Sequence, residues 1–78
     1  MGTLDEPREM DLAQVGWPFC LLEVKCALNA MAAGQVLRVR VSDPHVLGEM
    51  SRLLAASPDR VLETSDQGSH FLLTIKKG

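Results

Sequence analysis

Two periodic patterns of apolar residues mark the elements expected along the chain. Residues 10–13 alternate apolar and polar side chains, which predicts a short strand. Residues 18 to about 32 carry apolar side chains at three- and four-residue steps, which predicts a helix that Gly34 ends. The residues expected to point inward are Met10 and Leu12 in the strand and Leu21, Val24, Leu28 and Met31 in the helix.

A second strand and a second helix follow. Residues 35–41 alternate cleanly, so one face of this strand is expected in the core and the other, with Arg38 and Arg40, in water. Asp43 can cap the free backbone N–H groups of a helix that begins at Pro44 and runs to about Ala56. The inward residues are expected to be Leu37, Val39 and Val41 in the strand and Val46, Leu47, Met50, Leu53 and Leu54 in the helix.

The last part of the chain predicts a hairpin. Residues 60–64 and 69–76 have the composition of strands, and residues 65–68 between them are typical of a turn. Phe71, Leu73 and Ile75 are expected to face inward. The order β-α-β-α-β-β predicts an α/β (α+β) two-layer sandwich, in which both helices cover one face of a four-stranded mixed sheet.

Composition limits the organisation and the function class. The 78 residues, 46% of them apolar, suffice for one modest core, so we expect a flexible tail at residues 1–8 and one domain at residues 9–78. The net charge of −2 gives no strong attraction to nucleic acid or anionic membrane. No apolar run approaches the roughly 20 residues that span a bilayer, so we expect a cytoplasmic, monomeric protein with no membrane partner.

Cys20 and Cys26 are expected to be free thiols. On one helix their Cα atoms would lie roughly 9 Å apart, beyond the roughly 7 Å limit for a disulfide. His45 and His70 do not stand at ligand-like spacing from them. We therefore expect no metal and no cofactor.

A family resemblance begins at the first predicted helix. The stretch from Met10 through Trp17-Pro18-Phe19-Cys20 resembles the opening of the TusA (SirA/YedF) family, in which a hydrophobic-Asp strand and a turn lead to Cys-Pro-x-Pro. The landmarks Met31 to Gly34, Ser42-Asp43-Pro44 and the C-terminal end are also similar to that family. The resemblance implies the same sandwich fold. It also implies acceptance of persulfide sulfur from a cysteine desulfurase on the motif cysteine, and transfer onward, for example toward tRNA thiolation.

Trp17 occupies the position of the family's cysteine and Cys20 that of its second proline. Cys20 would lie in the first helical turn, on roughly the same face as Trp17, where the helix dipole lowers a thiol pKa. It is therefore a candidate sulfur acceptor, the alternative being a small buried hydrophobe. Cys26 lies in the middle of the helix, where the dipole effect has faded.

Two further surfaces are candidates for binding. Trp17, with Pro18 and Phe19, could anchor a partner, or Trp17 could pack as a hydrophobic staple on Leu21 or Leu22. Arg38 and Arg40 could bind RNA, but a solvated strand face is favoured because no surface aromatics accompany them.

Two functions remain as the leading hypotheses. The first is a sulfur carrier that relays persulfide through Cys20, with a cysteine desulfurase or a downstream sulfur-accepting protein as its partner. The alternative is a non-catalytic interaction or regulatory module that keeps the docking surface around Trp17.

Overall fold

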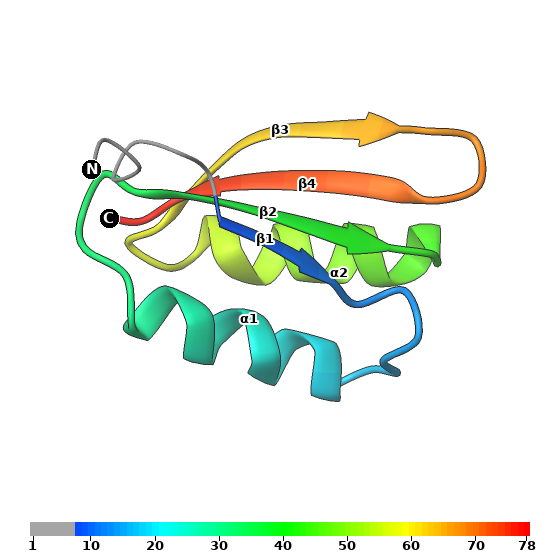
Figure 1. Cartoon of the computed structure of the whole chain (residues 1–78), viewed down its shortest axis with the longest axis horizontal. Coiled ribbons are helices and arrows are strands. Elements are labelled where there is room, and N and C mark those ends of the chain that lie inside the picture. The colour runs from blue at the N-terminus through cyan, green and yellow to red at the C-terminus, as the bar shows by residue number, and fades with distance from the viewer. Residues whose placement is uncertain (1–7) are drawn as a thin grey trace.

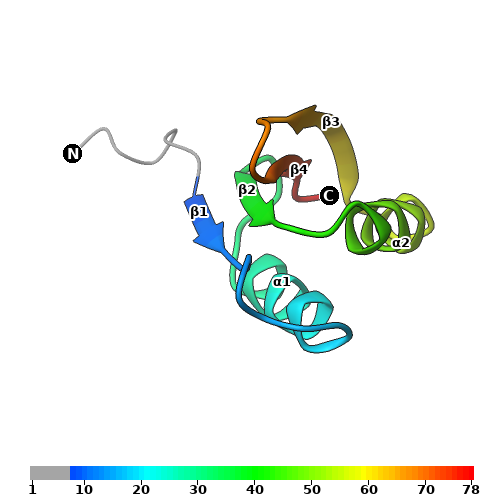
Figure 2. The same cartoon turned by 90° about the vertical axis from the view of Figure 1, so that its right-hand side faces the viewer.

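A computed structural model describes residues 8–78, and four strands and two helices alternate along them. Their bounds are Arg8–Asp11 (β1), Phe19–Asn29 (α1), Val36–Val41 (β2), Pro44–Ala55 (α2), Arg60–Asp66 (β3) and Phe71–Lys76 (β4). The strands form one sheet in the order β1-β2-β4-β3 (Figure 1). Strand β2 runs parallel to β1 and antiparallel to β4, which is also antiparallel to β3. Both helices lie on one face of the sheet (Figure 2), so the predicted α+β sandwich is confirmed.

Strand β1 begins earlier than the sequence pattern predicts. Arg8, which we expected in a tail, pairs with Leu37 on β2, because a parallel neighbour extends the ladder beyond the apolar residues. The rest of the expected tail, residues 1–7, lies outside the described residues. The strand ends at Asp11, but the N–H of Leu12 still donates to the carbonyl of Arg40 at 2.9 Å. Leu12 is buried, as predicted.

Helix α1 is shorter than predicted at its C-terminus. It ends at Asn29, and Gly34 is not its direct stop, because Ala30 caps the helix in a right-handed conformation. The N–H of Gly34, whose φ is +92°, donates instead to the carbonyl of Lys77 at 2.8 Å. The chain after α1 therefore forms a hydrogen bond to the end of the sheet instead of continuing the helix. Gly34 adopts the positive φ that the turn into β2 requires. At the other end Pro18 is the N-cap rather than the first helical residue.

Helix α2 begins at Pro44, where the sequence predicts it. Asp43 caps it, because its Oδ1 accepts a hydrogen bond from the N–H of His45 at 2.8 Å. On the outer surface Arg52 donates to Glu49 at 2.6 Å, and this hydrogen bond holds the pKa of Glu49 below its usual value.

The core face of α2 is narrower than the periodicity predicts. Met50 and Leu54, one turn apart, are fully buried against the sheet. Leu53, expected inward, is exposed, because it stands at the edge of the apolar stripe and turns away from the Met50–Leu54 row.

The hairpin of β3 and β4 turns later than predicted. Ser65 and Asp66, expected in the turn, pair with Leu72 and Phe71, so β3 runs two residues further. The turn is closed by the N–H of Gln67, which donates to the carbonyl of His70 at 2.8 Å. A register shift between Val61 and Glu63 leaves Leu62 as an extra residue. This bulge explains why Leu62 is exposed on an otherwise amphipathic strand.

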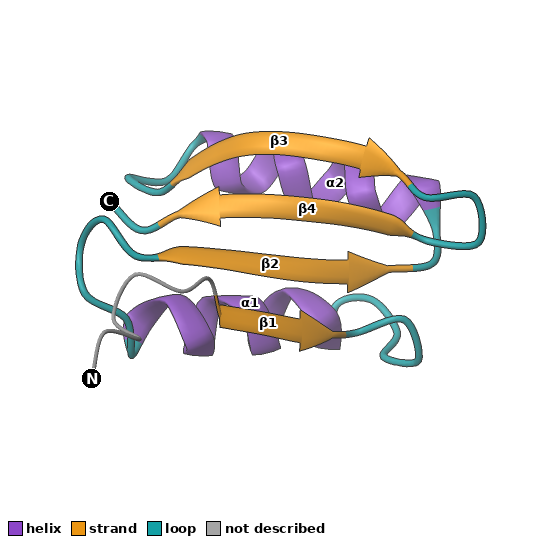
Figure 3. Ribbon diagram, turned by 45° about the horizontal axis from the view of Figure 1, so that its top comes forward, coloured by secondary structure: helices purple, strands orange, loops and turns teal. Residues whose placement is uncertain are grey.

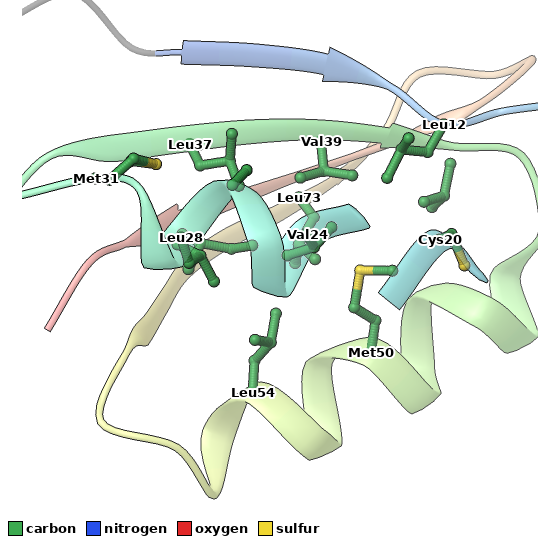
Figure 4. Close-up of a cluster of buried hydrophobic side chains, with 13 residues drawn as sticks. Leu12, Cys20, Val24, Leu28, Met31, Leu37, Val39, Met50, Leu54 and Leu73 are labelled. Atoms are coloured by element: carbon green, nitrogen blue, oxygen red, sulfur yellow. The ribbon is translucent and has the colours of Figure 1, made fainter. Parts of the chain in front are cut away.

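The core lies between the two helices and the inner face of the sheet (Figure 4). Its buried members come from α1, β2, α2 and β4 and from the residues that follow β1 and α1, and among those on the sheet Leu37, Val39, Leu73 and Ile75 are fully buried. They are Leu12, Cys20, Val24, Ala27, Leu28, Met31, Leu37, Val39, Val41, Met50, Leu54, Leu73 and Ile75. Cys20 thus belongs to the core, while Leu21 and Phe71, both expected inward, are only partly buried against it.

The Asp43 cap provides a test of how α2 begins. We expect Asp43→Ala to lower the free energy of unfolding by about 1 kcal/mol, because the N–H of His45 loses its acceptor. Urea denaturation followed by circular dichroism measures this change. Glu63→Ala is the matched control: it removes an exposed carboxylate from a strand and is expected to change stability by less than about 0.5 kcal/mol. Equal losses in the two variants would contradict the capping role.

Candidate functional site

The loop between β1 and α1 is held against the end of β2. Its Ala13 N–H donates to Asp11 Oδ1 at 3.1 Å, and its Ala13 carbonyl accepts from the Ser42 hydroxyl at 3.0 Å. The N–H of Val15 donates to the carbonyl of Leu12 at 3.0 Å. Because β1 and β2 are parallel, their carboxyl ends meet here, and the loop lies beside the connection from β2 to α2.

A pocket of about 250 Å³ opens between this loop and the start of α2. Trp17 lines the pocket on one side, and Ser42, Asp43 and Val46 line it on the other. The remaining lining residues are Leu12, Ala13, Gln14, Val15, Gly16 and Val41. Ligands of open sheets commonly bind at the carboxyl ends of parallel strands, which is where this pocket lies.

Three consecutive motif residues lie on the surface beside this pocket. Trp17 is 39% exposed and Phe19 is 63% exposed, and Pro18 between them is also exposed. The peptide bond between Trp17 and Pro18 is cis. Leu22, one turn further along α1, is exposed as well. These side chains form an apolar surface at the N-terminal end of α1, which we call the motif surface (Trp17, Pro18, Phe19 and Leu22).

Cys20 lies directly behind the motif surface and is fully buried, with 0% exposure. Figure 4 shows it in the core cluster with Val24 and Met50. The expectation that it shares a face with Trp17 is wrong. Trp17 precedes the helix, whereas Cys20 is one turn before Val24 and therefore faces the sheet with it. A thiol in this position is inaccessible to another protein unless the first turn of α1 opens.

The second thiol, Cys26, is exposed in the middle of α1. Both cysteines are free, as the spacing predicts. Among residues 8–78, no group of three or more His, Cys, Asp and Glu side chains is arranged to hold a metal ion. No helix in the same part of the chain is long and apolar enough to cross a membrane.

Arg38 and Arg40 lie on the open face of the sheet, away from the motif surface. Each is paired across β1 and β2 in register: Arg38 lies 3.7 Å from Glu9, and Arg40 lies 3.9 Å from Asp11. Exposed ion pairs of this kind contribute only about 0–1 kcal/mol to stability. The acidic partners nonetheless offset the positive charge of the arginines, so the structure shows no continuous basic stripe here.

The sequence pattern missed the pocket that Ser42 and Val46 form with the loop. A signal for it exists, because a strand-helix-strand unit joins parallel strands and so places their two carboxyl ends side by side. The loop after residue 11 and the start of α2 could therefore have been predicted to meet.

These features define a two-layer α+β domain whose first helix begins at an altered Cys-Pro-x-Pro motif. The family described as Sulfurtransferase TusA matches residues 9–77 of the chain. Sulfur carrier protein TusA of Allochromatium vinosum is 32% identical over 73 residues, which cover 94% of this chain and 96% of that protein. The chain therefore belongs to the TusA family of sulfur carriers, as the resemblance predicts.

Proposed function

We propose that this chain transfers sulfur between proteins in the cytoplasm, where thiols stay reduced, and that Cys20 is the thiol that carries the sulfur. The observation that supports this assignment is the position of Cys20 in the first turn of α1, immediately behind the motif surface. A helix N-terminus stabilises a thiolate, which is the form that attacks a persulfide. Cys26, although exposed, lacks this position.

The chemical step needs no oxidant. The Cys20 thiolate attacks the terminal sulfur of a persulfide on the partner, such as a cysteine desulfurase. A new S–S bond forms on Cys20, the S–S bond of the partner breaks, and the partner's cysteine leaves as a thiolate. Transfer to a downstream sulfur-accepting protein repeats the exchange with the roles of donor and acceptor reversed.

Burial of Cys20 requires that the first turn of α1 open before transfer. No side-chain cap resists this opening. Pro18, the N-cap, provides no side-chain hydrogen bond to the helix, whereas a capping side chain is typically worth about 1 kcal/mol. The turn is held by backbone bonds from Cys20 to Gly16 at 3.0 Å and from Leu21 to Pro18 at 3.0 Å. The motif surface beside it is exposed and available to a partner that would stabilise the open turn.

The complete burial of Cys20 is also compatible with a second candidate function. In this alternative the chain docks on a family partner through the motif surface and carries no sulfur itself. Tryptophan is enriched in interface hot spots, so a docking role suits Trp17.

Sulfur loading separates the two candidates. The protein is incubated with a cysteine desulfurase and cysteine, and its intact mass is measured without reductant. The carrier predicts an adduct of one sulfur atom on the wild type and on Cys26→Ser, and none on Cys20→Ala. The control is Trp17→Cys in a chain without the other two cysteines, which restores the family's motif cysteine.

Each outcome decides between the candidates. An adduct on this control but none on the wild type would overturn the carrier and support the docking protein. An adduct that survives Cys20→Ala but is lost in Cys26→Ser would overturn the assignment to Cys20. If no variant gains an adduct, a cysteine desulfurase is excluded as the partner in both candidate functions.

A further inference from the structure

Three cations gather at one end of the sheet, and we call them the C-terminal basic cluster (Arg60, Lys76 and Lys77). Arg60 on β3 and Lys76 on β4 stand directly opposite each other in the antiparallel register. All three residues line a pocket of about 250 Å³ together with Pro58 and Gly78. The grouping is tertiary, because β3 and the C-terminal end of the chain meet only in the folded sheet.

No ion pair in the described fold involves these three cations. Like charges directly opposite each other on neighbouring strands destabilise a sheet. The ion pairs within 4.0 Å among residues 8–78 involve Arg38, Arg40 and Arg52, and none involves the C-terminal basic cluster. The adjacent acid, Asp59, forms no ion pair with the cluster, and its Oδ1 accepts a hydrogen bond from the N–H of Gly78 at 2.9 Å.

The C-terminal basic cluster lies far from the motif surface. Figure 3 shows β4 ending, near the C-terminus, at the opposite end of the sheet from the loop that leads into α1. The six residues of β4 separate the two ends by roughly 20 Å. The cluster is therefore no part of the site around Cys20, and its role does not depend on sulfur chemistry.

We propose that the C-terminal basic cluster binds a carboxylate-rich segment of a protein partner. A pocket lined by three cations can pair with two or three carboxylates in one short stretch of chain. Bound carboxylates would relieve the repulsion between Arg60 and Lys76. The same repulsion that lowers the stability of the free protein therefore favours binding.

A short acidic peptide suits this surface better than a nucleic acid. Single-strand binders combine an extended positive track with aromatic platforms. The open face of the sheet instead carries Glu9, Asp11 and Glu63, and none of its outward positions in the described strands is aromatic.

Binding of a fluorescein-labelled oligoglutamate peptide, followed by fluorescence anisotropy at low salt, tests the proposal. We expect Arg60→Gln combined with Lys76→Gln to weaken binding about 10-fold or more, because two charged contacts are lost. The matched control combines Arg38→Gln with Arg40→Gln, which changes the net charge by the same amount, and is expected to weaken binding less than about 2-fold.

Two results would overturn the proposal. Equal weakening in both double variants would mean that net charge alone attracts the peptide. Tighter binding of a labelled single-stranded RNA than of the peptide, lost with the same two cations, would make the partner a nucleic acid.

Thermal unfolding gives a second readout on the same variants. Arg60→Gln is expected to raise the unfolding midpoint by a few degrees at low salt, because it removes half of a like-charge pair. The gain should shrink at high salt, where the repulsion is screened. A lower midpoint at low salt would show that Arg60 stabilises the fold, and would contradict a role reserved for binding.

Discussion

Leu37→Ala is expected to lower the free energy of unfolding by about 2–5 kcal/mol. Leu37 is fully buried on β2, a central strand that pairs with both β1 and β4, so the cavity left by its side chain lies in the middle of the sheet. A domain of this length has a total stability of only roughly 4–12 kcal/mol. The loss is therefore large enough to unfold a substantial part of the population, which urea denaturation followed by circular dichroism measures.

Leu62→Ala is the control for this prediction. It removes the same side chain from the bulge in β3, where the residue is 48% exposed. We expect it to cost less than about 1 kcal/mol, because little apolar surface is lost from the core. A similar cost in the two variants would contradict the central position of Leu37 in the core.

Cys20 is expected to react with a thiol reagent about 100-fold or more slowly than Cys26 in the folded protein. Cys20 has no exposed surface, whereas Cys26 is exposed on α1, so the reagent reaches Cys20 only after an opening of the structure. Each thiol is measured alone, Cys20 in Cys26→Ser and Cys26 in Cys20→Ala. In concentrated urea the two rates should converge, which controls for intrinsic reactivity.

The size of this protection identifies the opening that exposes Cys20. If only the first turn of α1 opens, Leu37→Ala should leave the labelling rate of Cys20 nearly unchanged, because Leu37 lies on β2. If the whole domain must unfold, the rate should rise in proportion to the lost stability. Local opening supports a gated sulfur carrier, and global opening contradicts it. Equal rates for the two thiols in the native protein would contradict the burial of Cys20.

Most of the fold could be predicted from the chain because its signals are local. Asp43 followed by Pro44 marks a helix start through a cap and a preset φ, and the structure begins α2 there. Strict alternation in β2 predicts which of its residues are buried, and Leu37, Val39 and Val41 are buried. Errors arose where a distant strand supplied the hydrogen bonds, as at the end of α1, where Lys77 accepts from Gly34.

The candidate site was less predictable, because its residues come together only through the sheet. The motif Trp17-Pro18-Phe19-Cys20 could be found by its resemblance to a family. The resemblance does not say which way each side chain points. That depends on where the helix begins, and Pro18 as the N-cap leaves Trp17 outside the helix.

The sequence by itself determined the order of the elements, the class of the fold and the family of the chain, because periodicity, capping and motif spacing are properties of neighbouring residues. Only the tertiary structure decided the state of Cys20 and the grouping of charges. Packing of α1 on the sheet places Cys20 in the core while Trp17 stays exposed. Strand pairing likewise sets Arg38 beside Glu9 but Arg60 opposite Lys76, which no local pattern in the chain records.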